Sequence, residues 1–162
     1  MREAEVKQDL FSYCAAVGVC EQGGLWQNAL SLLRELSDSR LELNVVACSA
    51  GIGACEESGH WEQALWLLGN LKETKMELDG LCYTSGISAC GTGGQWQQAL
   101  SLLREFVDTR LELNVIVYTS GISACHLGHQ WQHALSLLRG LTGMKLEADR
   151  RCYCATISAC EK

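Results

Sequence analysis

"TSGISAC" (residues 84–90) occurs again as "TSGISAC" at residues 119–125, 35 positions further along the chain. The recurrence covers nearly the whole sequence, because tryptophan and cysteine both return at the same step. The tryptophans in phase are Trp26, Trp61, Trp96 and Trp131, and the cysteines are Cys20, Cys55, Cys90, Cys125 and Cys160. A fixed period of this length is the mark of a repeat protein, in which stacked units share one continuous core.

The period divides the chain into units with clear boundaries. Four full repeats occupy residues 10–44, 45–79, 80–114 and 115–149. Residues 1–9 align with the end of a unit, so we expect the second half of a preceding helix and its closing turn. Residues 150–162 match only the first half of a unit. We therefore expect this chain to be a window from a longer array or the translation of a truncated gene model.

Each repeat predicts two helices, which we call the first and the second helix. In 80–114, one apolar stripe has i, i+4, i+7 spacing and another has i, i+3, i+4, i+7 spacing, both typical of helices. The first stripe is Tyr83, Ile87 and Cys90, and the second is Trp96, Ala99, Leu100 and Leu103. Between them lies GTGG, a loop signal whose counterparts are EQGG, EESG and HLGH. No segment indicates a strand, so we predict an all-α solenoid of stacked helix-turn-helix repeats.

Small residues recur inside the first helix, at Gly51, Gly86 and Gly121. A glycine within a helix costs about 1 kcal/mol relative to alanine. Its recurrence therefore predicts that adjacent first helices pack closely at these positions.

The composition narrows the class of protein. The net charge is −6, and there are ten cysteines and no proline. No 18-residue apolar run is present, and the N-terminus has the character of neither a signal peptide nor a transit peptide. Equivalent helices of stacked repeats lie about 10 Å apart, beyond the Cα separation of about 7 Å that a disulfide permits. We expect the five repeated cysteines to be buried and reduced.

The 35-residue period, repeat starts such as VIVYTSGISAC and ends such as KLEAD resemble the pentatricopeptide repeat over residues 10–162. Tetratricopeptide and ankyrin repeats have other periods and patterns. The family usually has proline before the last residue of the repeat, where this chain has Leu43, Leu78, Leu113 and Ala148. The resemblance implies a right-handed α-solenoid that binds single-stranded RNA, one base per repeat, and acts in chloroplast or mitochondrial RNA processing, stability or translation.

The resemblance also implies site residues. In the family, the fifth residue of the first helix and the last residue of the repeat contact the base edge, and the second residue stacks on the base. The base-specifying pairs are then Cys14 with Asn44, Ser49 with Asp79, Thr84 with Asn114, and Thr119 with Asp149. The stacking residues are Phe11, Val46, Leu81 and Ile116, with Arg151 as a further candidate.

The chemistry of these pairs agrees with the family's code. A Ser or Thr with Asp offers a carboxylate that accepts from guanine, and Thr with Asn offers a donor and an acceptor together, as adenine requires. The code gives one ambiguous base followed by G, A and G. Taken singly, the same residues are ordinary helix caps and turn residues.

The charge pattern speaks against tight RNA binding, which depends on phosphate neutralisation. The first helices of the four full repeats carry Glu21, Glu56 and Glu57 and no basic residue. Repeated arginines, such as Arg34, Arg104 and Arg139, fall in the second helices. Two alternatives stay open: a protein-interaction scaffold using an acidic, cysteine-lined concave face, and the structural interior of a larger array. The regular alternation of Asn and Asp favours RNA.

No pattern indicates catalysis. His60-Trp61-Glu62 matches the H-x-E of zinc deaminases, but no P-C-x-x-C follows. His126, His129 and His133 straddle a turn near Cys125, which belongs to an apolar stripe. Cys152 and Cys154 point to different faces of one helix. We expect a monomer with no catalytic residue, metal, cofactor or membrane contact.

Overall fold

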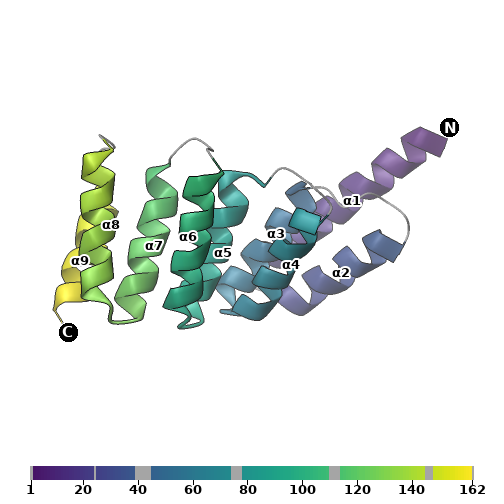
Figure 1. Cartoon of the computed structure of the whole chain (residues 1–162). Helices are drawn as coiled ribbons and strands as arrows, with labels where there is room; N and C mark the ends of the chain where they lie inside the picture. The colour runs from purple at the N-terminus through teal and green to yellow at the C-terminus, as the bar shows by residue number, and fades with distance from the viewer. Residues whose placement is uncertain are drawn as a thin grey trace.

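The computed structural model describes residues 2–23, 25–38, 45–73, 78–109, 114–144 and 148–161. Within these ranges the chain forms nine α-helices and no strand. They are α1 (Arg2–Gln22), α2 (Trp26–Asp38), α3 (Val45–Glu57), α4 (Trp61–Glu73), α5 (Gly80–Thr92), α6 (Trp96–Asp108), α7 (Val115–Leu127), α8 (Trp131–Gly143) and α9 (Arg150–Cys160). The helices form a row with the two termini at opposite ends (Figure 1). The predicted all-α solenoid is confirmed.

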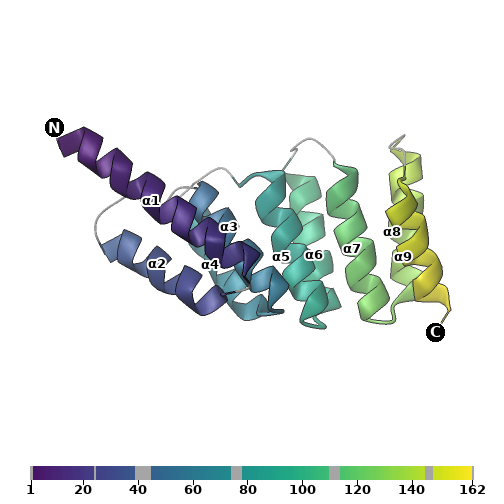
Figure 2. The same cartoon turned by 180° about the vertical axis from the view of Figure 1, so that it is seen from behind.

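The helices make two layers. The first helices α1, α3, α5, α7 and α9 each contact the next first helix, and each second helix contacts its own first helix and the following one. Figures 1 and 2 show the row from opposite sides. A first helix therefore has neighbours on several sides and is apolar around most of its surface. A second helix is amphipathic, and α6 buries Ala99, Leu100, Leu102, Leu103 and Phe106 on one side.

The core is a ladder of equivalent residues along the row. Ile52, Ile87 and Ile122 are each fully buried, in α3, α5 and α7. Ile157, at the same position of α9, is 59% exposed, because α9 packs against α8 but has no second helix of its own in this chain. Burial of each repeat thus depends on its neighbours, as expected for a solenoid.

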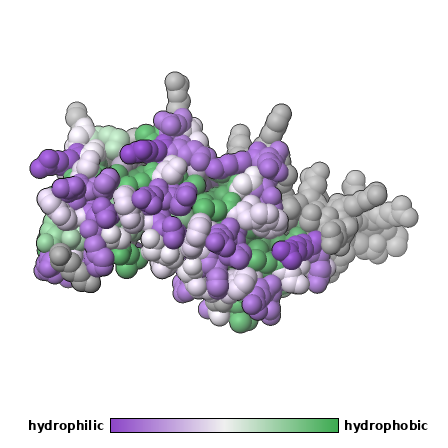
Figure 3. All heavy atoms as spheres, turned by 60° about the horizontal axis from the view of Figure 1, so that its bottom comes forward, coloured by the Kyte–Doolittle hydropathy of each residue, from purple (hydrophilic) through white to green (hydrophobic). Residues whose placement is uncertain are grey.

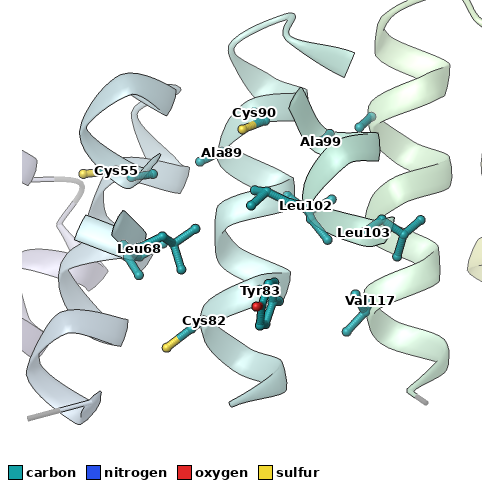
Figure 4. Packing of buried hydrophobic residues seen from close by; sticks show 14 of the residues in the cluster. Cys55, Leu68, Cys82, Tyr83, Ala89, Cys90, Ala99, Leu102, Leu103 and Val117 are labelled. Carbon is teal, nitrogen blue, oxygen red and sulfur yellow. The ribbon is translucent and has the colours of Figure 1, made fainter. Parts of the chain in front are cut away.

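The recurrent helix glycines contact different partners from those predicted. A Cβ on Gly86 would lie 2.5 Å from Leu68 Cδ1 of α4 and 3.5 Å from Leu102 Cδ1 of α6. Gly51 and Gly121 likewise face leucines of the two adjacent second helices. The prediction of contact between first helices at these positions is therefore wrong. The missing side chain instead makes room where a first helix sits between two second helices, and Figure 4 shows Leu68 in this packing.

Two predicted helix boundaries differ from those in the structure. Residues 1–9 were expected to include a closing turn, but α1 runs without interruption from Arg2 to Gln22. This segment holds helix-forming Glu, Ala, Lys and Gln and no glycine before Gly18, so nothing local ends the helix. The expected GTGG loop starts later than predicted, since Gly91 and Thr92 complete the last turn of α5.

The structure places all ten cysteines as free thiols. Burial raises the pKa of Cys55, Cys90 and Cys125 to about 11, so these thiols stay protonated at neutral pH. Cys20 is also buried, but Cys160 is exposed, contrary to the prediction, because in this chain α9 is not followed by a second helix of its own.

Candidate nucleic-acid interface

Three of the predicted repeat-end residues are helix N-caps with extended backbone. Asp79 Oδ1 accepts a hydrogen bond from the Cys82 backbone N–H at 2.9 Å, at the start of α5. Asp149 Oδ1 does the same with Cys152 at 2.9 Å, at the start of α9. The backbone N–H of Cys152 holds the pKa of Asp149 below its usual value. Capping is thus one real role of these residues, and it occupies one oxygen of each carboxylate.

Asn114 caps α7 in a slightly different way. Its Oδ1 accepts from the Ile116 backbone N–H at 2.9 Å, two residues ahead rather than three. Because an asparagine side chain has one oxygen and one NH₂ group, the oxygen is used here. The amide NH₂ group makes no hydrogen bond in this cap, so it is the donor with which Asn114 would contact a ligand, and the oxygen keeps a second lone pair.

Two of the fifth residues of the first helices, Thr84 and Thr119, already make hydrogen bonds within their own helix. The hydroxyl of Thr84 donates to the Gly80 carbonyl at 2.7 Å, and that of Thr119 donates to the Val115 carbonyl at 2.8 Å. A hydroxyl has only one hydrogen, and in each threonine it is given to the backbone carbonyl. The Cys152 sulfur lies 2.9 Å from Thr119 Oγ1 and also interacts with the Asp149 carboxylate. Both threonines are therefore acceptors toward any ligand. Ser49 is buried and Cys14 is half-buried.

The predicted stacking residues form an exposed aliphatic series. Val46 is 68% exposed, and Leu81 and Ile116 are each 59% exposed. Arg151 is exposed at the equivalent position of α9. Asn44 lies outside the described residues, and so does the side chain of Phe11.

One cavity joins these features between α7 and α9. Its volume is about 410 Å³. The lining residues are Ser88, Ile116, Thr119, Ser120, Ser123, Asp149, Arg151 and Cys154. The structure thus brings the Thr119–Asp149 pair together with the side chains at two successive stacking positions. The sequence analysis did not select Ser88, Ser120 and Ser123. Ser120 and Ser123 are three residues apart on α7, and Ser88 is the equivalent of Ser123 one repeat earlier, so this recurrence was a usable signal.

The charge of the first-helix layer is uneven along the row. Glu21 at the end of α1 and Glu56 at the end of α3 both have raised pKa values, chiefly because they are partly buried and also because of neighbouring carboxylates. Glu56 also accepts from the hydroxyls of Ser85 and Ser88 on α5. Among the described side chains of the first helices, the only Lys or Arg residues are Arg150 and Arg151 of α9. The acidic and basic groups therefore lie toward opposite ends of the row.

Two of the histidines pack against tryptophans of the preceding repeat. His60 lies against Trp26 with ring centroids 4.0 Å apart, and His133 lies against Trp96 at 5.3 Å. In the described part of the chain, no group of three or more His, Cys, Asp or Glu side chains is placed to hold a metal ion. Cys152 is buried and Cys154 is exposed, on different faces of α9. The helices in that part of the chain lack the combined length and apolarity of a membrane span.

Comparison with known proteins agrees with this geometry. Residues 81–109, from α5 through α6, match the family model described as PPR repeat. The crystal structure of the pentatricopeptide repeat protein PPR10 from maize superposes with a TM-score of 0.73 at 20% sequence identity, covering 91% of this chain and 21% of that chain. PPR10 in complex with an 18-nt psaJ RNA element gives a TM-score of 0.80 at 17% identity, again over 91% and 21% of the two chains.

A triple cysteine-to-serine form of PPR10 with the same RNA element gives the same TM-score of 0.80. The chain spans about a fifth of the PPR10 structures it matches. The sequence has no match among the curated proteins. At these identities the superpositions establish a common fold.

Proposed function

We propose that this chain, a pentatricopeptide repeat protein, binds single-stranded RNA along its layer of first helices, with one base per repeat. The observation that carries the proposal is the cavity between α7 and α9, where Ile116, Thr119 and Asp149 lie together. These are the stacking residue and the base-specifying pair of one repeat. The solved structures of PPR10 with RNA support it, since they share this fold.

In the fourth repeat, the polar groups that remain for a base are acceptors. The carboxylate of Asp149 can only accept hydrogen bonds: its Oδ1 accepts from the Cys152 N–H, and the carboxylate also interacts with the Cys152 thiol and with Arg151. The hydroxyl hydrogen of Thr119 is donated to the Val115 carbonyl. Guanine presents two neighbouring donors, N1–H and the N2 amino group, on its pairing edge. An acceptor-only site therefore favours guanine.

In the third repeat, the remaining groups are one donor and one acceptor. Asn114 Oδ1 is held by the Ile116 N–H, so its amide NH₂ is the available donor. Thr84 donates to the Gly80 carbonyl and offers oxygen lone pairs. The pairing edge of adenine has one acceptor, N1, and one donor, the N6 amino group. This pair therefore matches the pairing edge of adenine.

The full proposal covers the array. The Ser49–Asp79, Thr84–Asn114 and Thr119–Asp149 pairs are assigned to G, A and G in the 5′ to 3′ direction. Cys14 with Asn44 is assigned to a preceding base of no fixed identity. Val46, Leu81 and Ile116 supply the stacking surfaces, together with Phe11. By family resemblance we assign the role to processing, stability or translation of organellar RNA, without catalysis.

The test exploits the fact that Asp and Asn are equally good N-caps. Fluorescent RNAs containing 5′-GAG-3′, 5′-GGG-3′ or 5′-GUG-3′ are titrated with the wild-type chain and with Asn114→Asp. We expect the wild type to prefer GAG and Asn114→Asp to prefer GGG, each by several-fold, with the fold of both proteins unchanged. Equal binding of all three RNAs by the wild type would contradict base-by-base recognition.

One observation favours a second candidate. Glu21, Glu56 and Glu57 give one end of the first-helix layer a negative charge, which suits a basic peptide better than a phosphate chain. Figure 3 shows the molecule with the bottom of Figure 1 turned forward, where polar residues are interspersed with small apolar areas. If the RNA titrations show no binding, the protein-interaction scaffold becomes the better proposal.

A further inference from the structure

We infer that the cavity between α7 and α9 is the anchoring site of the array, where Arg151 holds a guanine nucleotide by stacking its guanidinium on the base and neutralising the adjacent phosphate. This inference rests on the proposed function. It assigns Arg151 a specificity-determining and affinity-determining role that the other repeats do not have.

The first support is the residue type at one repeated position. Val46, Leu81 and Ile116 are aliphatic, whereas α9 has Arg151 at the equivalent place. Ile116 and Arg151 both line the cavity, on neighbouring helices. A base in the cavity therefore has an aliphatic side chain on one helix and a guanidinium on the next. Guanidinium planes stack on unpaired bases, and the cation is attracted to the face of the ring.

The second support is the charge of the layer. The helices α3, α5 and α7 contain no Lys or Arg. Arg150 and Arg151 are the only Lys or Arg among the described side chains of the first helices, and Glu21 and Glu56 lie several repeats away. Electrostatic attraction between exposed groups decays over about 8 Å at physiological salt. The positive charge therefore acts at the α9 end, and this is where an RNA phosphate is stabilised.

The third support is the set of polar side chains that line the cavity. Asp149 and Thr119 present acceptors, and Arg151 lies close enough to Asp149 to interact with its carboxylate. Ser120 and Ser123 of α7 add hydroxyls to the rim. Acceptors toward the base edge and a cation toward the base face match guanine, whose pairing edge carries donors and whose purine ring has a large stacking surface.

The test compares Kd values for GAG-containing RNA among the wild type, Arg151→Leu, Arg151→Lys and Arg150→Leu. Arg151→Leu installs the residue type of the other repeats, and Arg150→Leu removes the same charge from a residue outside the cavity lining. We expect Arg151→Leu to weaken binding about tenfold and to lower the salt dependence by about one phosphate contact. Arg151→Lys keeps the salt dependence and recovers only part of the affinity, because an ammonium has no planar face. Arg150→Leu changes Kd by less than about threefold.

A second arm uses RNA with an abasic nucleotide in place of the last G of GAG. With this RNA, wild type and Arg151→Lys bind equally, since no base remains to stack. Circular dichroism checks that each variant keeps its helices. Selective binding of GAG RNA with no loss in Arg151→Leu, or an equal loss in Arg150→Leu, overturns the inference and leaves the proposed function standing. Absence of RNA binding by the wild type overturns both.

Discussion

At the scale of single residues, the turn inside the second, third and fourth repeats contains one residue with left-handed backbone conformation. Gly59 has φ 65°, Gly94 has φ 73° and His129 has φ 55°. Glycine adopts this conformation without steric penalty, whereas other L-residues have a cost of about 1–2 kcal/mol. The fourth repeat therefore carries local strain that the second and third do not.

The first prediction follows from this difference. His129→Gly should raise the free energy of unfolding by about 0.5–1 kcal/mol, since relief of strain exceeds the extra chain entropy of glycine. Gly94→Ala should lower the free energy of unfolding. Because a Cβ on Gly94 meets no atom within 4 Å, this change measures the backbone strain without an added steric clash. Urea denaturation measures both variants. A stability loss in His129→Gly would mean that the His129 side chain makes a stabilising contact that outweighs the strain.

At the scale of elements, the solenoid is held together where a first helix sits between two second helices. Leu68 of α4 is 1% exposed and faces the bare backbone of Gly86 in α5. By contrast, a Cβ added to Gly69, on α4 itself, meets no atom within 4 Å. These two glycines have the same helix propensity and opposite surroundings.

The second prediction uses that pair. Gly69→Ala should stabilise the protein by about 0.5–1 kcal/mol through helix propensity. Gly86→Ala should destabilise it by about 1–3 kcal/mol, because overpacking against a buried leucine outweighs the same propensity gain. Thermal and urea unfolding give both values. The double variant Leu68→Ala/Gly86→Ala should lose less unfolding free energy than the two single variants lose together. Strict additivity would show that an added methyl group at position 86 does not clash with Leu68.

At the scale of the whole molecule, the described glutamates within the first helices lie toward the α1 end of the row. The folded-state pKa values of Glu21 and Glu56 are raised above the ordinary value of 4.5, first by burial and then by nearby carboxylates that include Glu57. Folding therefore favours the protonated forms of Glu21 and Glu56. Their contribution to stability is fully present below pH about 4.5 and is lost as the pH rises through the folded pKa values.

The third prediction is the corresponding pH dependence. Between pH 7 and pH 5, the urea midpoint should rise as the pH falls. Glu56→Gln should be more stable than the wild type at pH 7 and should show a flatter profile, while still accepting from the Ser85 and Ser88 hydroxyls. Glu62→Gln, on the exposed surface of α4, serves as the charge-matched control. A wild-type midpoint that falls steadily from pH 7 to pH 5 would show that other groups dominate the titration.

The sequence alone determined the 35-residue period, the helix pair in each repeat, and the register in which Thr84 precedes Asn114 and Thr119 precedes Asp149. Helix periodicity and cap residues are set by spacings of a few positions, and the period and the register follow from comparing one repeat with the next. The base-specifying role of the pairs stays a prediction, while their capping role is seen at Asp79, Asn114 and Asp149.

Only the tertiary structure decided which surfaces meet. It turned Gly86 toward leucines of second helices, exposed Cys160, and placed Ser123, Ile116 and Arg151 around one cavity. No spacing within one repeat encodes these contacts. They depend on how each second helix lies between two first helices, and that arrangement is fixed by the stacking of neighbouring repeats.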